Sequence, residues 1–423
     1  MREKLRVLLV AFNSCSSPHY FSLALGYLKA SALADPELSE RVSIETADFC
    51  VDCNSVTQVL FYLAGAQPDV VGLSCYCWNM EKMSDLVRLA AGVLPNAKFI
   101  LGGPEVGPVA DEVLVKNPNA AAVVRGEGEK TFAECLKLLA EGKPLSSVAG
   151  VTYRDGESII ANPDRPPIEN LDEIPSPYLT GALRPIDGVT YLETYRGCPF
   201  SCAYCYEGKG LKRLRYFSDE RVKSEIELVL SHPEVRSFSF IDSVFNLSKE
   251  RLTKLAGWLS RAEERGVGLH TIEIAAEQVD EKTVELFKKA NVISVETGPQ
   301  AVHPETIANA HRKFDREKFA FGVRGLENAG IKVECDMIIG LPGDNFFRFA
   351  KTAAYVFSLA PSKVVFSTLN VLPGTDLYRR AAEFGLEFDE KAPHVVQQTA
   401  SFPFRELRKA EMFARSLDRE YNA

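Results

Sequence analysis

The sequence predicts an α/β protein of two domains, each built from parallel strands that alternate with helices. Three observations support this fold class. Apolar, strand-like runs alternate with helical patterns over residues 1–145, the same alternation resumes after residue 189, and a proline-rich stretch separates the two series. Buried apolar strands that alternate with helices are typical of parallel sheets covered by helices.

A doubly wound, Rossmann-like sheet is predicted over residues 1–145. The expected strands are 6–12, 42–47, 69–75, 97–101 and 121–124, and the expected helices are 22–33, 80–93 and 131–140. Residues 146–185 break this rhythm with a hairpin that turns at Asp155-Gly156 and with six prolines. We interpret them as a hairpin and a proline-rich linker between the domains.

A partial (β/α)6 TIM-like barrel is predicted over residues 186–374. The expected strands are 190–196, 237–242, 269–275, 293–297, 332–339 and 363–370, with helices at 219–230, 249–265, 281–290, 317–329 and 345–359. Six strand–helix units suit an incomplete barrel better than a closed barrel of eight. The tail, residues 375–423, is expected to be short and mostly helical, with a possible strand near Val395.

Length and composition restrict the classes of function. A chain of 423 residues is long enough for two or three domains with buried cores. Its net charge of −8 argues against broad, non-specific binding of nucleic acid. No apolar run approaches the length of a membrane span, and the start does not resemble a signal peptide, so we expect a cytoplasmic protein. Its ten cysteines are then expected to be reduced.

Three cysteines within eight residues form the most informative motif. Cys198, Cys202 and Cys205 follow the first strand of the second domain, and Gly197 and Pro199 indicate a loop. Three thiolates can hold an iron–sulfur cluster and leave one iron without a protein ligand, so that it can bind a substrate or cofactor. Structural zinc is the alternative, but it needs a fourth ligand, and no Cys or His follows nearby until His232.

The spacing Cys-x3-Cys-x2-Cys, placed after the first strand of a six-unit barrel, resembles the radical S-adenosylmethionine (SAM) superfamily. The resemblance implies that Cys198, Cys202 and Cys205 are the catalytic ligands of a [4Fe–4S] cluster. SAM would bind the fourth iron and be cleaved to a 5′-deoxyadenosyl radical. It further implies a set of residues that contact SAM or substrate: Tyr204, Asp242, Glu273, Glu296, Gln300 and Gly340.

The case for a ligand-binding role is stronger for some residues of the barrel than for others. Glu273 and Glu296 would point into the barrel, where a charge is costly without a partner, and this favours a functional role. Gly340 could equally be a turn glycine. His303 and His311 follow the fourth strand and fit solvated helix ends better than ligands.

The amino-terminal domain resembles the cobalamin (B12)-binding domains that are fused to radical SAM enzymes. The resemblance rests on residues 18–27 and on three further stretches: Ser74, Tyr76, Trp78 and Asn79; Gly102, Gly103, Pro104 and Glu105; Gly126, Glu127 and Gly128. It implies that these three stretches bind cobalamin at the carboxyl ends of the strands. Their glycines would let the backbone approach a bulky corrin. The Asp-x-His-x-x-Gly motif that supplies a cobalt ligand in many such domains is absent, and His19 is not expected to replace it.

The two resemblances together imply a cobalamin-dependent radical SAM methyltransferase that acts on an unactivated carbon of a small molecule. A flavodoxin- or ferredoxin-type electron donor is the expected partner. Alternatives are a cyclase or rearrangement enzyme of the same architecture, a methylthiotransferase and a non-catalytic cobalamin or SAM sensor. The methylthiotransferase would carry a second cluster on three amino-terminal cysteines, for which the candidates are Cys15, Cys50 or Cys53, and Cys75 or Cys77. The basic residues Lys209, Lys212, Arg213 and Arg215 could steer an anionic partner, but a solvated loop is their more usual meaning.

Overall fold

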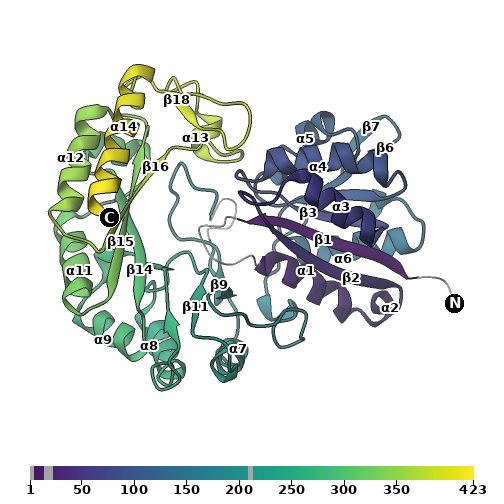
Figure 1. Cartoon of the computed structure of the whole chain (residues 1–423), viewed down its shortest axis with the longest axis horizontal. Coiled ribbons are helices and arrows are strands. Elements are labelled where there is room, and N and C mark those ends of the chain that lie inside the picture. The colour runs from purple at the N-terminus through teal and green to yellow at the C-terminus, as the bar shows by residue number, and fades with distance from the viewer. Residues whose placement is uncertain (1–3, 14–21, 208–212) are drawn as a thin grey trace. The chain divides into compact units, whose positions relative to one another are not determined.

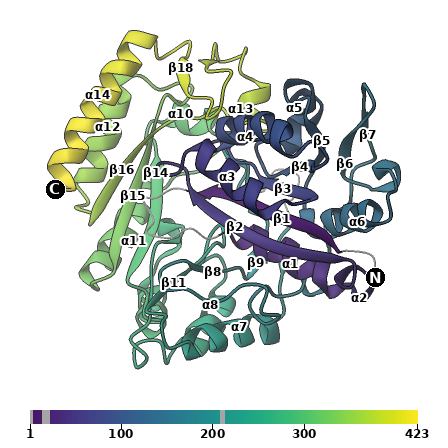
Figure 2. The ribbon, with the colours of Figure 1, turned by 45° about the vertical axis from the view of Figure 1, so that its right-hand side comes forward.

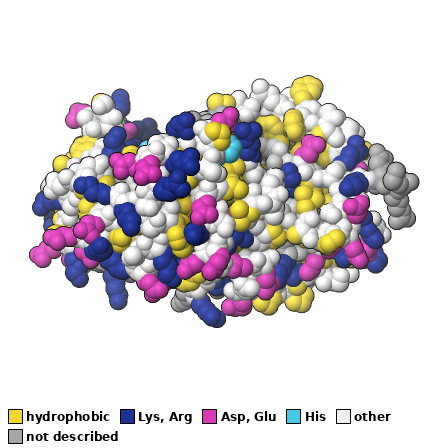
Figure 3. Space-filling view, turned by 90° about the horizontal axis from the view of Figure 1, so that it is seen from below, with side chains coloured by type: hydrophobic (Ala, Val, Ile, Leu, Met, Phe, Trp, Pro, Cys, Tyr) yellow, Lys and Arg dark blue, Asp and Glu magenta, His cyan; other side chains and the backbone are white. Residues whose placement is uncertain are grey.

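The computed structural model describes residues 4–13, 22–207 and 213–423, and the chain divides into two compact units, residues 1–184 and 185–423 (Figure 1). No helix in these three ranges is long and apolar enough to cross a membrane. On the face drawn in Figure 3, acidic and basic side chains are interspersed and form no broad basic surface.

The first unit is built on a seven-stranded sheet with the order β2-β1-β3-β4-β5-β6-β7. Strands β1 to β5 run parallel, and the hairpin β6–β7 adds two antiparallel strands at the edge. The doubly wound parallel sheet predicted from the sequence is therefore confirmed. The strands are β1 Leu5–Asn13, β2 Val42–Cys50, β3 Val70–Ser74, β4 Lys98–Gly102, β5 Ala120–Val124, β6 Val151–Asp155 and β7 Ser158–Ala161.

Helices cover both faces of this sheet. Figures 1 and 2 show α1, α2 and α6 on one face and α3, α4 and α5 on the other. The apolar run of β1 is buried along its whole length because both faces are covered, which explains why it lacks polar alternation. The helices are α1 Leu23–Ala34, α2 Pro36–Ser39, α3 Val56–Ala66, α4 Met80–Val93, α5 Ala110–Lys116 and α6 Gly128–Ala140.

Helices α3 and α5 are absent from the sequence-based prediction. A signal for α3 was present, since Ser55 and Gln58 form a capping box at its start. Helix α5 spans only seven residues, which is too short for a clear helical period. The missed helices complete the strand–helix alternation.

Residues 146–184, which the sequence predicts as hairpin and linker, pack as part of the first unit. The guanidinium of Arg125 donates to the Asn162 carbonyl at 2.5 Å and to the Asp164 carboxylate at 2.8 Å. The Glu127 carboxylate accepts a 2.7 Å hydrogen bond from the Ile168 amide. These contacts attach the proline-rich stretch to the end of β5.

The second unit contains six parallel strand–helix units, as predicted. Its strands form two parallel sheets, β12-β11-β8 and β13-β14-β15-β16, and their spatial order follows their order in the chain. Thr271, whose φ is +50°, separates β12 from β13, so the predicted third strand is two short pieces. The strands are β8 Thr190–Leu192, β9 Tyr195–Arg196, β10 Arg215–Tyr216, β11 Ser237–Phe240, β12 Gly268–Leu269, β13 Ile272–Glu273, β14 Ser294–Gln300, β15 Lys332–Ile339, β16 Lys363–Thr368, β17 Glu387–Phe388 and β18 Val396–Gln398.

Helices lie on one face of the β13–β16 sheet and leave the other face to the barrel interior (Figure 1). Along β15, Val333, Cys335 and Met337 are buried, whereas the alternate residues are only partly buried. The tail adds the β17–β18 pair and the long α14, which packs on β16. The helices are α7 Asp219–Ser231, α8 Lys249–Trp258, α9 Glu281–Lys289, α10 Pro304–Asn309, α11 Arg316–Asn328, α12 Phe346–Phe357, α13 Asp376–Arg379 and α14 Phe404–Tyr421.

Replacing Gly103 by alanine is expected to destabilise the first unit by roughly 2–4 kcal/mol. The φ of Gly103 is +123°, and a Cβ there would lie 2.3 Å from the Cys75 carbonyl oxygen. Gly92, in α4, has no atom within 4 Å of the corresponding position, so Gly92→Ala serves as the matched control. Denaturant unfolding followed by circular dichroism measures both variants. Equal stability of the two would contradict this account of Gly103.

Candidate functional site

The three motif cysteines follow β9, a two-residue strand that pairs antiparallel with β10 and comes shortly after β8, the first strand of the barrel. All three thiols are free; Cys198 is buried, and Cys202 and Cys205 are partly buried. Burial raises the pKa of the Cys205 thiol to about 12, and the neighbouring Glu207, Cys202 and Cys198 add to the rise. The other two motif cysteines therefore lie near enough to Cys205 to affect the charge on its sulfur.

Hydrogen bonds from three other segments fix this cysteine loop. The Ala203 amide donates to the Ala310 carbonyl, which follows α10, at 2.9 Å, and the Ala203 carbonyl accepts from the Leu377 amide in α13 at 2.9 Å. The Ser243 hydroxyl, beyond β11, donates to the Gly197 carbonyl at 3.0 Å. The loop is consequently held on both sides of Cys202 by elements distant in sequence.

Arg312 forms a further contact with the cysteine loop. Its guanidinium donates to the Tyr204 hydroxyl at 2.8 Å and to the Gly298 carbonyl in β14 at 3.0 Å. Among the described residues, no carboxylate lies within ion-pair distance of it. Arg312 was not predicted as a site residue, because nothing in the sequence around it indicates that it contacts Tyr204. The preceding residue, His311, is exposed and lies near Asp376 and Arg380, as expected for a solvated helix end.

Asp242 has its carboxylate taken up by hydrogen bonds within the protein. It is 2% exposed, and its carboxylate accepts hydrogen bonds from the Thr194 amide, at 2.7 Å, and from the Thr194 hydroxyl. Burial raises the pKa of this carboxyl to about 6. The side chain joins the end of β11 to the β8–β9 turn.

Charged side chains form a row across four neighbouring strands of the barrel. Glu273 is in register with Glu296, Glu296 with Glu334, and Glu334 with Lys363. Lys363 forms an ion pair with Glu334 at 2.7 Å. The row brings together the two predicted glutamates and adds Glu334, which the sequence analysis did not identify.

Asp336 lies two residues beyond Glu334 on the same face of β15, and carboxylate oxygens of Glu296, Glu334 and Asp336 all lie within 4.8 Å of one another. Burial, followed by the charge of Glu296, raises the pKa of Asp336 to about 9. Burial and the neighbouring carboxyl groups thus favour the protonated form of Asp336. Glu273, at the other end of the row, is exposed to solvent. The polar–apolar alternation of β15 was the signal that could have identified Glu334 and Asp336.

Two further predicted residues lie at strand ends. Gln300 ends β14 with a φ of +61° and is partly buried. Gly340 follows β15 with a φ of +94°, and a Cβ there would lie 2.6 Å from Val396 and 3.3 Å from Leu407. Packing of the tail against β15 is thus sufficient to require glycine at position 340.

In the first unit, the predicted cobalamin residues gather at the carboxyl edge of the sheet. Tyr76 and Trp78 follow β3 and stack with ring centroids 4.3 Å apart and planes 12° from parallel. Trp78 is 47% exposed, whereas Ser74 and Asn79 are buried. The edge thus presents a flat aromatic pair to solvent.

The glycine-rich stretches follow the two adjacent strands, β4 and β5. Gly102 ends β4, Gly103 approaches Cys75 closely, and the sequence continues through Pro104 to the buried Glu105. Gly126 has a φ of +72° and no atom within 4 Å of a Cβ position, so its backbone is open. Gly128 begins α6, and Glu127 is hydrogen-bonded to Ile168, as described above.

The remaining predictions concern His19, the basic run and the amino-terminal cysteines. His19, Lys209 and Lys212 lie outside the described residues. The prediction that the basic run is solvated is wrong for Arg215, which lies in β10 and is only 5% exposed. Of the cysteines considered for a second cluster, Cys15 lies outside the described residues, Cys53 is exposed, and Cys75 is fully buried.

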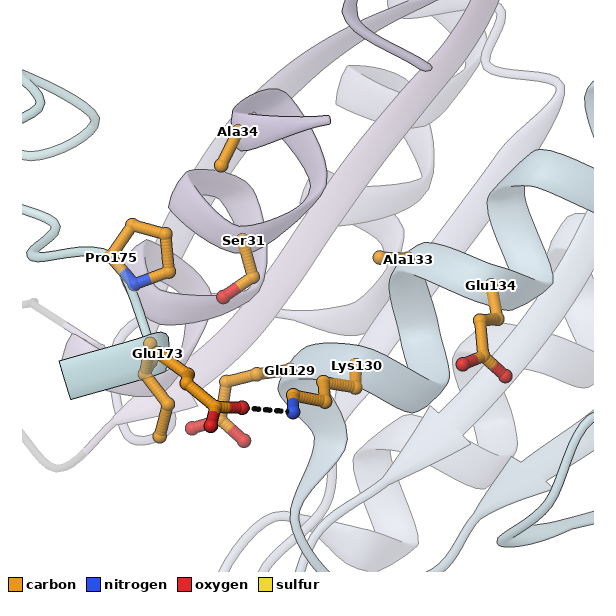
Figure 4. Close-up of a pocket in the computed structure, with 9 residues that line it drawn as sticks. Ser31, Ala34, Glu129, Lys130, Ala133, Glu134, Glu173 and Pro175 are labelled. Carbon is orange, nitrogen blue, oxygen red and sulfur yellow. Dashed lines mark hydrogen bonds and ion pairs between the residues drawn. The ribbon is translucent and has the colours of Figure 1, made fainter. Parts of the chain in front are cut away.

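A cavity of about 210 Å³ lies between α1, α6 and the segment 173–175, away from these residues. Figure 4 shows Ser31, Glu129 and Glu134 around it, with the ion pair between Lys130 and Glu173 at one side. None of the candidate residues lines it. It is lined by helix side chains and not by the loops that follow the strands.

Comparison with known proteins identifies both units. Residues 192–356 match the family model of the radical SAM superfamily, and residues 30–136 match that of the B12 binding domain. An uncharacterised methyltransferase of Pyrococcus horikoshii is 27% identical over 323 residues, 74% of this chain and 69% of that protein. The cobalamin-dependent radical SAM methyltransferase TokK of Streptomyces tokunonensis is 33% identical over 192 residues, 43% of this chain but only 28% of its own length.

Two longer matches extend over both units of the chain. An anaerobic magnesium-protoporphyrin IX monomethyl ester cyclase of Rubrivivax gelatinosus is 26% identical over 388 residues, 88% of this chain and 67% of the cyclase. The solved structure of the radical SAM methyltransferase TsrM from Kitasatospora setae has a TM-score of 0.74 and 18% identity, and covers 95% of this chain and 81% of TsrM. The TsrM match confirms the fold. The chain belongs to the radical SAM superfamily, among the members that carry an amino-terminal B12-binding domain.

Proposed function

We propose that this chain is a cobalamin-dependent radical SAM methyltransferase that methylates an unactivated carbon of a small molecule. The observation that carries the proposal is the set of three free thiols on one pinned loop that follows the first barrel strand. The two domain matches assign a [4Fe–4S] cluster, SAM and cobalamin to the same chain. Methyltransferases among its relatives support methyl transfer as the reaction.

The donor chemistry of each site fits its cofactor. Cys198, Cys202 and Cys205 supply three thiolates for a cluster that keeps one iron open to SAM. The stacked Tyr76 and Trp78, at the same edge of the sheet as the open backbone of Gly126, suit the flat faces of a corrin. When bound, the cluster and SAM supply one-electron chemistry that opens an unreactive C–H bond, and cobalamin supplies the methyl group.

The polar groups of the barrel match the polar groups of SAM. Arg312 lies next to the cysteine loop, and the described residues offer it no carboxylate partner, so its remaining N–H groups can bind the SAM carboxylate. Glu273 and Glu296 can accept hydrogen bonds from ammonium or ribose hydroxyl groups. The raised pKa of Asp336 favours its neutral form and so limits the repulsion among the carboxyl groups.

Cyclisation is the second candidate reaction, because the Rubrivivax gelatinosus cyclase matches over 88% of this chain. The two reactions differ in their co-products. Methyl transfer through cobalamin consumes SAM both as methyl donor and as radical source, whereas cyclisation does not require a methyl group. A flavodoxin- or ferredoxin-type protein is proposed as the electron donor in either case.

Product analysis tests the proposed reaction. The full chain is reconstituted anaerobically with iron, sulfide and hydroxocobalamin, and then receives SAM, a reductant and candidate small molecules. Methyl transfer predicts both 5′-deoxyadenosine and S-adenosylhomocysteine, and 5′-deoxyadenosine alone favours the cyclase. Neither product, from protein with a full cluster and bound cobalamin, would refute catalysis as proposed.

Cys202→Ala is expected to abolish cluster assembly, because two thiolates cannot retain the cubane. Iron analysis should give about four irons per wild-type chain and less than one per variant chain. Cys53→Ser is the matched control and should keep full iron content. About eight irons in the wild type, together with a loss of iron in Cys53→Ser, would instead favour the methylthiotransferase alternative.

Arg312→Met is expected to weaken SAM binding by about 10- to 100-fold, the range for a lost hydrogen bond to a charged group. Tyr204→Phe removes only the hydroxyl contact of Arg312 and should have a smaller effect. Equilibrium binding of SAM to the reconstituted protein measures both, at matched iron content. Arg324→Met, on the exposed side of α11, controls for the loss of charge. Unchanged affinity in Arg312→Met would exclude the proposed role.

A further inference from the structure

Asn79 is a buried amide at the edge where the first unit presents its aromatic pair. It is 1% exposed. Its Nδ2 donates to the Phe12 carbonyl at the end of β1 and to the Ser74 carbonyl at the end of β3, both at 3.0 Å. Its Oδ1 accepts from the Tyr76 amide at 2.9 Å. One side chain thus connects two strand ends and the turn that carries Tyr76.

The same carbonyl anchors the aromatic pair. The Trp78 Nε1 donates to the Phe12 carbonyl at 3.2 Å, so Phe12 receives a hydrogen bond from both Trp78 and Asn79. Trp78 then stacks on Tyr76, whose amide is held by Asn79. The position and tilt of both rings therefore depend on bonds that meet at Phe12 and Asn79.

The Asn79 side chain does not cap the helix that it precedes. It is the N-cap residue of α4, where an asparagine side chain commonly accepts a hydrogen bond from the first turn of the helix. Here it makes no such bond, and the side chain points back to the strands. The backbone amides of Asn79 and Met80 donate instead to the Tyr76 carbonyl, at 3.1 and 3.0 Å. The Asn79 side chain thus holds the edge of the sheet and does not cap the start of α4.

We infer that Asn79 is a positioning residue that holds Tyr76 and Trp78 in the orientation that receives the corrin. The inference rests on the proposed function, because it assumes that this edge binds cobalamin. Only a carboxamide supplies two N–H donors and an acceptor in this geometry. Aspartate has the same shape but would place oxygen atoms against two carbonyl oxygens.

The test compares two isosteric substitutions in the full chain. Trp78 and Trp258 are the only tryptophans of the sequence, so a Trp258→Phe background leaves Trp78 as the single fluorophore of its kind. Hydroxocobalamin is titrated as the probe, and quenching of Trp78 emission gives the dissociation constant. Asn79→Asp is expected to raise this constant by about 10- to 100-fold, the range for loss of an outer-shell partner, and to shift the emission of Trp78 before cobalamin is added.

Asn162→Asp is the matched control within the same unit. Asn162 is also buried, and its Nδ2 also joins two backbone carbonyls, those of Leu145 and Val148, at 2.9 and 2.8 Å. It lies away from the aromatic pair, at the end of the β6–β7 hairpin. We expect Asn162→Asp to lower the melting temperature while it leaves cobalamin affinity and Trp78 emission unchanged. A merely structural role of Asn79 would make the two variants alike.

The outcomes separate this inference from the proposed function. No binding of hydroxocobalamin by the parent protein would contradict the proposed cofactor. Binding by the parent protein and equal binding by Asn79→Asp would overturn the role of Asn79. Should Asn79→Asp not fold, Trp78→Phe retains a ring and removes the bond to Phe12. Its affinity is measured by ultrafiltration from the absorbance of free cobalamin. An affinity unchanged from wild type would then reject the anchored aromatic pair.

Discussion

Hydrogen bonds that fix the loops beyond the carboxyl ends of parallel strands are the constraint on which both units depend. Within a parallel sheet the backbone groups are paired with neighbouring strands, so free backbone groups for binding are found in the loops that follow the strands. Such loops keep one shape only if their own polar groups find partners. In the second unit, Ala203, which lies between Cys202 and Cys205, is hydrogen-bonded to both Ala310 and Leu377. In the first, Asn79 performs the same task for the turn after β3.

Charge inside the barrel is tolerated because it is neutralised in two different ways. Lys363 pairs with Glu334 at one end of the charged row. Near its centre, burial and the proximity of Glu296 raise the pKa of Asp336 and favour its protonated form, since two adjacent carboxylates cannot both ionise cheaply. The resulting face is rich in acceptors without carrying its full formal charge. Such a face suits ligands with hydroxyl or ammonium groups, whereas Arg312 provides a separate donor site next to the cysteine loop.

The sequence was sufficient for features encoded by local pattern and insufficient for those that depend on distant partners. Strand–helix alternation predicted both sheets, and the cysteine spacing predicted the loop after β9. Arg312 escaped notice because its partner Tyr204 is 108 residues away. The bonds that Asp242 and Glu127 form with Thr194 and Ile168 span 48 and 41 residues, and no local signal indicates them. Motif resemblance indicates which positions matter but does not distinguish a ligand contact from a supporting bond.

Without the histidine motif, the aromatic edge would have to supply a larger share of the free energy of cobalamin binding. A domain that offers cobalt an imidazole gains part of its affinity from a coordinate bond. In this chain the motif is absent, so the proposed binding at the edge would depend more on the apolar area that the corrin buries, worth about 25 cal/mol per Å², and on the rigidity of the surface that meets it. A flexible aromatic pair would lose part of that gain as ordering entropy when the ligand binds. The buried bonds of Asn79 and the shared Phe12 carbonyl remove much of this loss in advance, because they fix Tyr76 and Trp78 before any ligand arrives.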